Sequence, residues 1–245
     1  VDLGADDPGA MSFSAEEGEL CLYALAGPTL PDVMRQFTAL VGRAPLPPLW
    51  ALGFHQSRWG YRTVADFRRV AHEFRARRLP CDVLTFDIDY MDGYRVFTWN
   101  RAEFPDLPGL VDELAGQGFR SVAIVDPGIK VDPGYEVYDS GLREDAFLRM
   151  PDGSLVSGPV WPGMCHFPDF TRPAVRGWWA ERVAGLLRSV GFAGLWNDMN
   201  EPTITTLRMG ATLPDAAQHS WEGIGRSHAG GGHNVYGMLM ARATR

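Results

Sequence analysis

Two acids follow a short apolar run near the end of the chain, in residues 194–202, GLWNDMNEP. Side chains alternate along a β-strand, so Trp196 and Asp198 are expected to share one face of a strand. Pro202 has no N–H and disfavours helix in Glu201, so the strand must end before it. The stretch therefore predicts carboxylates beside an aromatic ring at the mouth of a loop, where an acid can serve as a nucleophile or a proton carrier.

The segments around this stretch alternate between strand and helix patterns. Strands are predicted at 50–56, 82–89, 120–126 and 193–198, and helices at 63–78, 108–116 and 172–190. Such alternation predicts a parallel sheet with crossover helices, which is either doubly wound or a barrel. No GxGxxG or Walker-type glycine loop follows any of these strands, which favours the barrel.

Acids close three of the four predicted strands: Asp87 and Asp89, Asp126, and Asp198. The carboxyl ends of parallel strands lie on one side of the sheet, and that side carries the active site of such proteins. These carboxylates are therefore expected to converge. At the end of the second predicted strand, Asp87 and Asp89 are both candidates for a substrate contact.

The chain falls into three predicted regions. A β-like run at 19–26 places the end of a preceding domain in residues 1–27, and residues 28–48 form a helix (29–41) and a Pro-rich connector. Residues 49–245 carry the strand–helix pattern, with a long inserted loop at 127–171 that is rich in aromatic residues. The chain starts with Val and stops inside a predicted helix, so we expect it to be a piece of a longer protein.

Composition excludes several classes of protein. A net charge of −7 argues against a nucleic-acid partner. No apolar run is long enough for a membrane span, and no signal peptide is recognisable. The three cysteines, Cys21, Cys81 and Cys165, fit neither a disulfide framework nor a metal site, so we expect no metal, no cofactor and a reducing, cytoplasmic location.

Carboxylates combined with exposed aromatic rings are typical of sugar binding, because sugars present hydroxyl groups at their edges and C–H groups on their faces. The predicted mouth offers the carboxylates together with Trp59, Trp161, Trp196 and Phe167. Glycoside hydrolysis needs two carboxyl groups on opposite sides of the scissile bond, about 5–5.5 Å apart when configuration is retained. Asp198 is the candidate nucleophile.

Several motifs taken together resemble glycoside hydrolase family 31, and its α-glucosidases in particular. They are residues 50–61 (WALGFHQSRWGY), 87–92 (DIDYMD), 160–163 (VWPG), 167–170 (FPDF), 196–202 (WNDMNEP) and 233–237 (HNVYG). The resemblance spans residues 20 to 245, with the motifs in the family's order. It implies a (β/α)₈ TIM barrel, of which the first four βα units are present, preceded by the end of a β-sandwich.

The resemblance also implies a function and assigns residues to it. The implied activity is that of a retaining, exo-acting α-glucosidase, which cleaves terminal α-linked glucose from oligosaccharides through a covalent glucosyl-enzyme intermediate on Asp198. Glu201 is expected to support this nucleophile, and Asp87 to hold sugar hydroxyl groups. The residues expected to line the sugar pocket are Ile88, Trp59, Ile129, Trp161, Trp196 and Met199.

The chain departs from the family pattern at three points. Asn197 and Thr85 replace an aliphatic and an aromatic residue, and Asn197 is expected to hydrogen-bond a crossover helix. The family's acid/base aspartate comes from the second half of the barrel, which these residues lack, so we expect them to be inactive and prone to association by themselves. The alternatives are an α-xylosidase, a transglucosidase, an α-glucan lyase or a non-catalytic carbohydrate-binding fragment, and the oligomeric state stays open.

Overall fold

A computed structural model describes residues 2–14, 21–205, 211–221 and 224–245. The chain divides into two compact units, Val1–Pro47 and Pro48–Arg245.

The first unit contains one helix, α1 (Leu30–Val41), among its described residues. Thr29 begins it, because its hydroxyl oxygen accepts a hydrogen bond from the Asp32 amide at 3.4 Å. The helix predicted at 29–41 is thus confirmed. Residues 21–26 form no strand, contrary to the β-like pattern, whereas Glu19 and Leu20 lie outside the described residues. The β-sandwich assignment of residues 1–27 stays a prediction.

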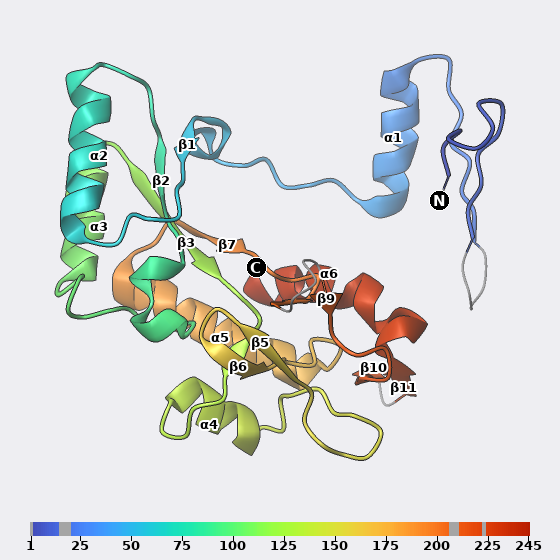
Figure 1. Ribbon diagram of the computed structural model, residues 1–245. Coiled ribbons are helices and arrows are strands. Elements are labelled where there is room, and N and C mark those ends of the chain that lie inside the picture. The colour runs from blue at the N-terminus through green and yellow to red at the C-terminus, as the bar shows by residue number, and fades with distance from the viewer. Residues whose placement is uncertain (1, 15–20, 206–210, 222–223) are drawn as a thin grey trace. The chain divides into compact units, whose positions relative to one another are not determined.

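The second unit is built on a parallel sheet of four strands in the order β1-β2-β3-β7 (Figure 1). The strands are β1 (His55–Gln56), β2 (Val83–Phe86), β3 (Arg120–Val125) and β7 (Gly194–Asn197). The helices that follow them are α2 (Val64–Ala76), α3 (Leu107–Gly116), α5 (Pro173–Val190) and α6 (His233–Thr244). This is the predicted succession of four βα units.

The first strand is much shorter than predicted. Residues 50–56 were expected to be extended, but Leu49–Leu52 form a 3₁₀ turn, in which the Ala51 amide bonds the Pro48 carbonyl at 2.9 Å. Only His55 and Gln56 pair with β2. Among the described strands β1 has β2 as its single neighbour, so the apolar run receives little support for an extended conformation.

Local signals explain why the helices begin and end where they do. Thr63 and Asp66 form a capping box at the start of α2, each side chain bonding the other residue's backbone amide. Gly191 ends α5 with a φ of 87°, a conformation that favours glycine. The predicted helices at 63–78, 108–116 and 172–190 are confirmed within a few residues.

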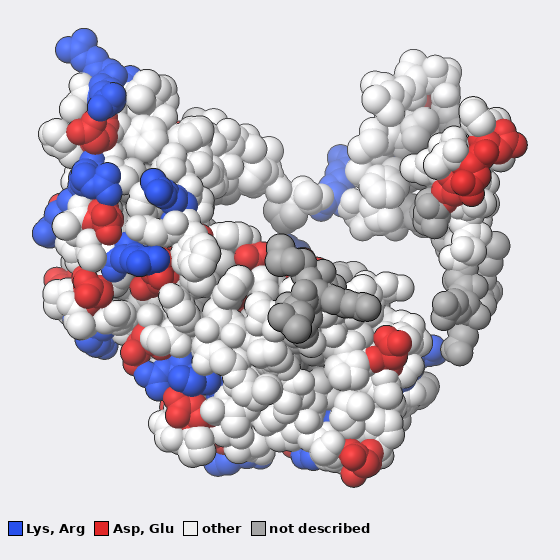
Figure 2. Space-filling model, in the orientation of Figure 1, with Lys and Arg blue, Asp and Glu red and all other residues white. Residues whose placement is uncertain are grey.

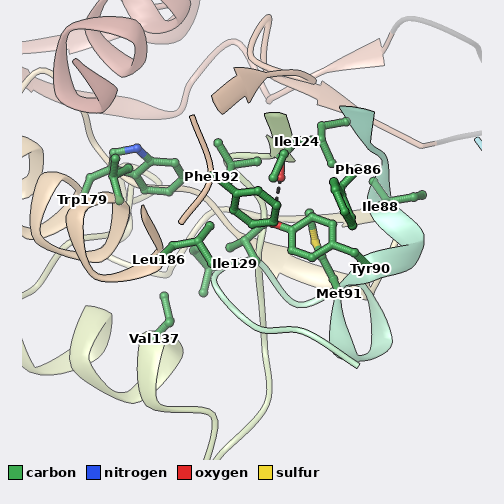
Figure 3. Close-up of a cluster of buried hydrophobic side chains, with 14 of the residues drawn as sticks. Phe86, Ile88, Tyr90, Met91, Ile124, Ile129, Val137, Trp179, Leu186 and Phe192 are labelled. Carbon is green, nitrogen blue, oxygen red and sulfur yellow. Dashed lines mark hydrogen bonds between the residues drawn. The ribbon is translucent and has the colours of Figure 1, made fainter. Parts of the chain in front are cut away.

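An aromatic core joins the sheet to its helices (Figure 3). The Phe86 ring of β2 stacks on Phe67 of α2, with centroids 3.8 Å apart, and meets Phe192 at 5.3 Å. Tyr90 is fully buried, and its hydroxyl donates to the Ile124 carbonyl of β3 at 3.1 Å. Phe86, directly before Asp87, and Tyr90, three residues after it, are thus fixed by packing.

The long insertion at 127–171 has structure of its own. It contains β4 (Ile129–Lys130), α4 (Glu136–Arg143), β5 (Ser157–Val160) and β6 (Gly163–His166), with the strands in an antiparallel sheet of order β4-β6-β5. The segment read as one inserted loop is therefore a small subdomain placed between β3 and α5 (Figure 1).

The insertion contacts the segment that follows β7. That segment contains β8 (Thr203–Ile204), β9 (Ala211–Thr212), β10 (Gln218–Trp221) and β11 (Ile224–Ser227). The Thr205 amide donates to the Pro159 carbonyl at 2.7 Å. A Cβ on Gly158 would lie 2.5 Å from the Ile204 side chain, so glycine is needed for this close approach. The segment that follows the candidate nucleophile is therefore held against the insertion at Ile204 and Thr205.

The surface over α2 and α3 carries interspersed charges of both signs (Figure 2). Arg68 of α2 pairs with Glu113 of α3 at 2.7 Å, and Arg77 pairs with Glu73 at 2.7 Å. No helix in the described ranges is both long enough and apolar enough to cross a membrane.

Candidate active site

Three carboxylates follow directly on three neighbouring strands. Asp87 comes after β2, Asp126 after β3 and Asp198 after β7. The register pairs Val125 with Asn197, and the Asp198 amide donates to the Val125 carbonyl at 3.2 Å. Asp126 and Asp198 are therefore neighbours across two adjacent strand ends, as the sequence predicted.

The residues that precede these acids show which face of the sheet the acids occupy. Phe86 packs on α2, and Asn197 Oδ1 accepts a hydrogen bond from the Thr244 hydroxyl of α6 at 3.0 Å. The expected bond between Asn197 and a crossover helix is thus confirmed. Because side chains alternate, Asp87 and Asp198 lie on the opposite face, away from the helices.

Asp126 is the most buried of the three acids. Only 5% of the residue is exposed, and its Oδ1 has no hydrogen-bond partner among the described residues. Neighbouring strands lie about 5 Å apart, and two unit charges at that distance repel by about 3 kcal/mol at an effective dielectric constant of about 20. Burial first, then the charges of Asp198 and Asp87, raise the pKa of Asp126 from 3.8 to about 7.

Asp87 responds to the same surroundings more weakly. Burial raises the pKa of its carboxyl group, its own bond from the Ile88 amide at 2.7 Å lowers it, and the charges of Asp89 and Asp198 raise it again. This partly buried carboxylate therefore faces other acids.

Asp89 has a different environment. Its side chain is 8% exposed and lies 3.5 Å from the Arg62 guanidinium, and it accepts a bond from the Tyr94 hydroxyl at 3.3 Å. A carboxylate paired in this way is held in a structural contact. The geometry favours Asp87 over Asp89 as the substrate contact.

Asp126 makes stability depend on pH. Its pKa is higher in the folded chain than in the unfolded chain, so its stabilising effect is complete below about pH 4 and is lost as the pH rises through about 7. Asp126→Asn removes this loss, which is about 1.4 kcal/mol per pH unit within that window. Relative to the wild type, the free energy of unfolding of the variant should increase by about 2–3 kcal/mol between pH 5 and pH 8. Urea unfolding at both pH values measures this, and a difference independent of pH would contradict it.

Three of the four aromatic residues predicted for the site, Trp59, Trp161 and Trp196, are exposed. Trp59, in the loop after β1, is 58% exposed, and its ring centroid lies 6.0 Å from that of Trp161, at the turn between β5 and β6, with 40° between the planes. Trp196 is exposed on β7, two residues before Asp198 and therefore on the same face. The structure brings Trp59 and Trp161 together, whereas Phe167 is fully buried in the core.

The other predicted pocket residues have different surroundings. Ile88 and Ile129 are buried, so in the described chain their side chains contact protein. Met199 has a φ of 55°, which turns the chain sharply after Asp198, and its carbonyl accepts from the Thr203 amide at 3.0 Å. Glu201 is exposed and accepts a bond from the Thr203 hydroxyl at 2.8 Å. The roles of these residues toward a sugar stay predictions.

Comparisons with known proteins agree with the fold. Residues 44–245 match the model of the glycosyl hydrolases family 31 TIM-barrel domain. The chain is 46% identical to alpha-glucosidase 2 of Bacillus thermoamyloliquefaciens, over 95% of this chain and 29% of that protein. It is 40% identical to human neutral alpha-glucosidase AB, over 95% of this chain and 24% of that protein.

A crystal structure of the glucosidase II alpha subunit in a DNJ-bound form superimposes with a TM-score of 0.80 at 32% identity, over 89% of this chain and 23% of that chain. The chain thus spans less than a third of the length of these relatives. Its four βα units correspond to part of their barrel. The chain belongs to glycosyl hydrolase family 31.

Proposed function

We propose that the protein containing this chain is a retaining, exo-acting α-glucosidase that hydrolyses terminal α-linked glucose from oligosaccharides. The observation that carries the proposal is the position of Asp198, at the end of β7 beside Asp126 and on the same strand face as Trp196. The names of the relatives support glucose as the sugar.

The reaction follows from the placement of the carboxylates. An Asp198 oxygen attacks the anomeric carbon from the face opposite the leaving group, and the bond to the glycosidic oxygen breaks. A second carboxyl group gives its proton to that oxygen and then removes a proton from the water that hydrolyses the glucosyl ester. We expect this acid/base from the other half of a complete barrel. Asp87 accepts hydrogen bonds from sugar hydroxyl groups and thereby fixes the ring relative to Asp198.

Intact-mass measurement after incubation with 5-fluoro-α-glucosyl fluoride tests the proposal on the complete polypeptide that contains these residues. Fluoride leaves with little need for protonation, whereas the ring fluorine slows hydrolysis of the ester. We expect one added fluoroglucosyl mass, on the peptide containing Asp198. Labelling by only the matching xylosyl reagent would identify an α-xylosidase, and a folded protein that takes no label would contradict a retaining mechanism.

The three cysteines are free, and two of them, Cys81 and Cys165, are buried. We therefore propose a reducing compartment as the protein's location.

The exposed ring of Trp59 should act on substrate binding more than on the chemical step. Stacking of a sugar on an aromatic ring contributes about 1 kcal/mol, so Trp59→Ala is expected to raise the KM for malto-oligosaccharides about 5-fold. Glucosyl fluoride has no second sugar, so its KM should change much less if Trp59 stacks on that second sugar. Steady-state kinetics with both substrates measure the difference, and equal effects on the two would contradict this role.

A further inference from the structure

Asp126 is a titratable group that the proposed reaction leaves unused. It stands between the two acids that the reaction needs, because β3 lies between β2 and β7 in the sheet. Its carboxyl group is nearly fully buried, and its Oδ1 lacks a hydrogen-bond partner among the described residues. An ionised carboxylate that is buried without hydrogen-bond partners is unfavourable. The presence of an acid at this position therefore needs a reason other than the stability of the fold.

Four titratable groups lie around Asp126. Asp87 follows β2, Asp198 follows β7, and Cys165 lies on β6 of the insertion. Tyr90 also interacts with Asp126, and its hydroxyl is committed to the Ile124 carbonyl. Within the described ranges no ion pair includes Asp87, Asp126 or Asp198. The described groups that interact with Asp126 are therefore anionic or neutral.

We propose that Asp126 is a positioning residue that keeps a proton while the site is empty and releases it when a positively charged group binds beside Asp87 and Asp198. On release the O–H bond of the carboxylic acid breaks, the electron pair stays on Asp126, and the proton passes to water. The inference rests on the proposed function, since a positive charge develops on the sugar ring as the glycosidic bond breaks.

The retained proton has a clear physical effect. With Asp126 neutral, the described part of the empty site has no third negative charge between Asp87 and Asp198. An ionised Asp126 would repel the charges of both neighbours at close range. Asp198 must be ionised to attack, so Asp126 acts on the reaction through its neighbour. A cation in the site offsets the repulsion, and the third carboxyl group then ionises.

Calorimetry tests the proposal by counting protons. The probe is N,N-dimethyl-1-deoxynojirimycinium, a sugar-shaped ring with a permanent positive charge that cannot itself titrate. Binding is measured at pH 6 in buffers with different protonation enthalpies. We expect the wild type to release about one proton per probe bound and Asp126→Asn to release almost none. Glucose, which is neutral, should release none from either protein.

Asp89→Asn is the matched control. Asp89 is also a buried carboxylate near the end of β2, but it is paired with Arg62. Its variant should release as many protons as the wild type. The proposal is overturned if the wild type releases no proton, or if Asp126→Asn releases as many as the wild type.

A ligand-free measurement decides the question if the probe does not bind. The infrared difference between wild type and Asp126→Asn should contain the C=O band of a protonated carboxylic acid at pH 6, and this band should disappear above about pH 7. Absence of the band at pH 6 overturns the proposal. Failure of this inference is separable from failure of the proposed function, because the fluoroglucosyl label on Asp198 reports the function alone.

Discussion

Replacing Asp198 with alanine is expected to lower the rate of glucoside hydrolysis by about 10⁴-fold or more, the scale seen when a covalent nucleophile is lost. The side chain supplies the atom that bonds the anomeric carbon, and no other described carboxylate takes its place. Asp126 is its neighbour, but with a pKa of about 7 it is largely protonated below about pH 6. Hydrolysis of an aryl α-glucoside by the complete polypeptide measures the loss.

Azide distinguishes loss of the nucleophile from loss of the fold. In Asp198→Ala the space left by the carboxylate admits this small anion, which attacks the anomeric carbon of glucosyl fluoride from the same face. We expect β-glucosyl azide, with inverted configuration, and partial recovery of the rate. Asp112→Ala, at an exposed position of α3, is the matched control and should keep full activity. A variant of Asp198 that keeps substantial activity without azide would remove Asp198 from the role of nucleophile.

The helices were predictable because their signals are local. The capping box at Thr63 and Asp66 and the glycine at 191 each depend on a few neighbouring residues. A bond between Asn197 and a crossover helix was also predictable, since strand alternation alone places Asn197 on the face opposite Asp198, but its partner Thr244 was not. The helix caps and the face of Asn197 needed no knowledge of distant contacts.

The features that sequence reasoning missed depend on distant residues. The run at 50–56 has a strand-like pattern, but only His55 and Gln56 find partners on β2. The strands of the insertion have two to four residues each, too few for a hydrophobic period to be recognised. Asp126 was expected at the mouth with the other acids, but its burial and its unpartnered oxygen arise only when β2, β6 and β7 surround it. The sequence signal that pointed to Asp126 was its place one residue after a strand, which Asp87 and Asp198 share.

Phe86→Ala is expected to destabilise the second unit by about 3–5 kcal/mol, the usual cost of removing a fully buried phenylalanine. Phe86 has no exposed surface, stacks on Phe67 at 3.8 Å and meets Phe192 and Tyr90 edge to face (Figure 3). Deleting the ring leaves a cavity between β2 and α2 that these rigid aromatic neighbours cannot fill. Urea unfolding followed by tryptophan fluorescence measures the change, with the slope of the transition as a check on cooperativity.

The same substitution should also weaken substrate binding, because Phe86 is the residue directly before Asp87. Its packing on α2 fixes the end of β2 and hence the direction in which the Asp87 carboxylate points. Phe54→Ala is the matched control: Phe54 is half exposed and contacts Phe74 at 5.9 Å, so its loss should cost about 1 kcal/mol or less and leave KM unchanged. Equal stability of the two alanine variants would show that the aromatic stack does not hold β2 in place. The position of Asp87 would then depend on the hydrogen bond from the Ile88 amide and on the 3₁₀ turn that follows Asp87.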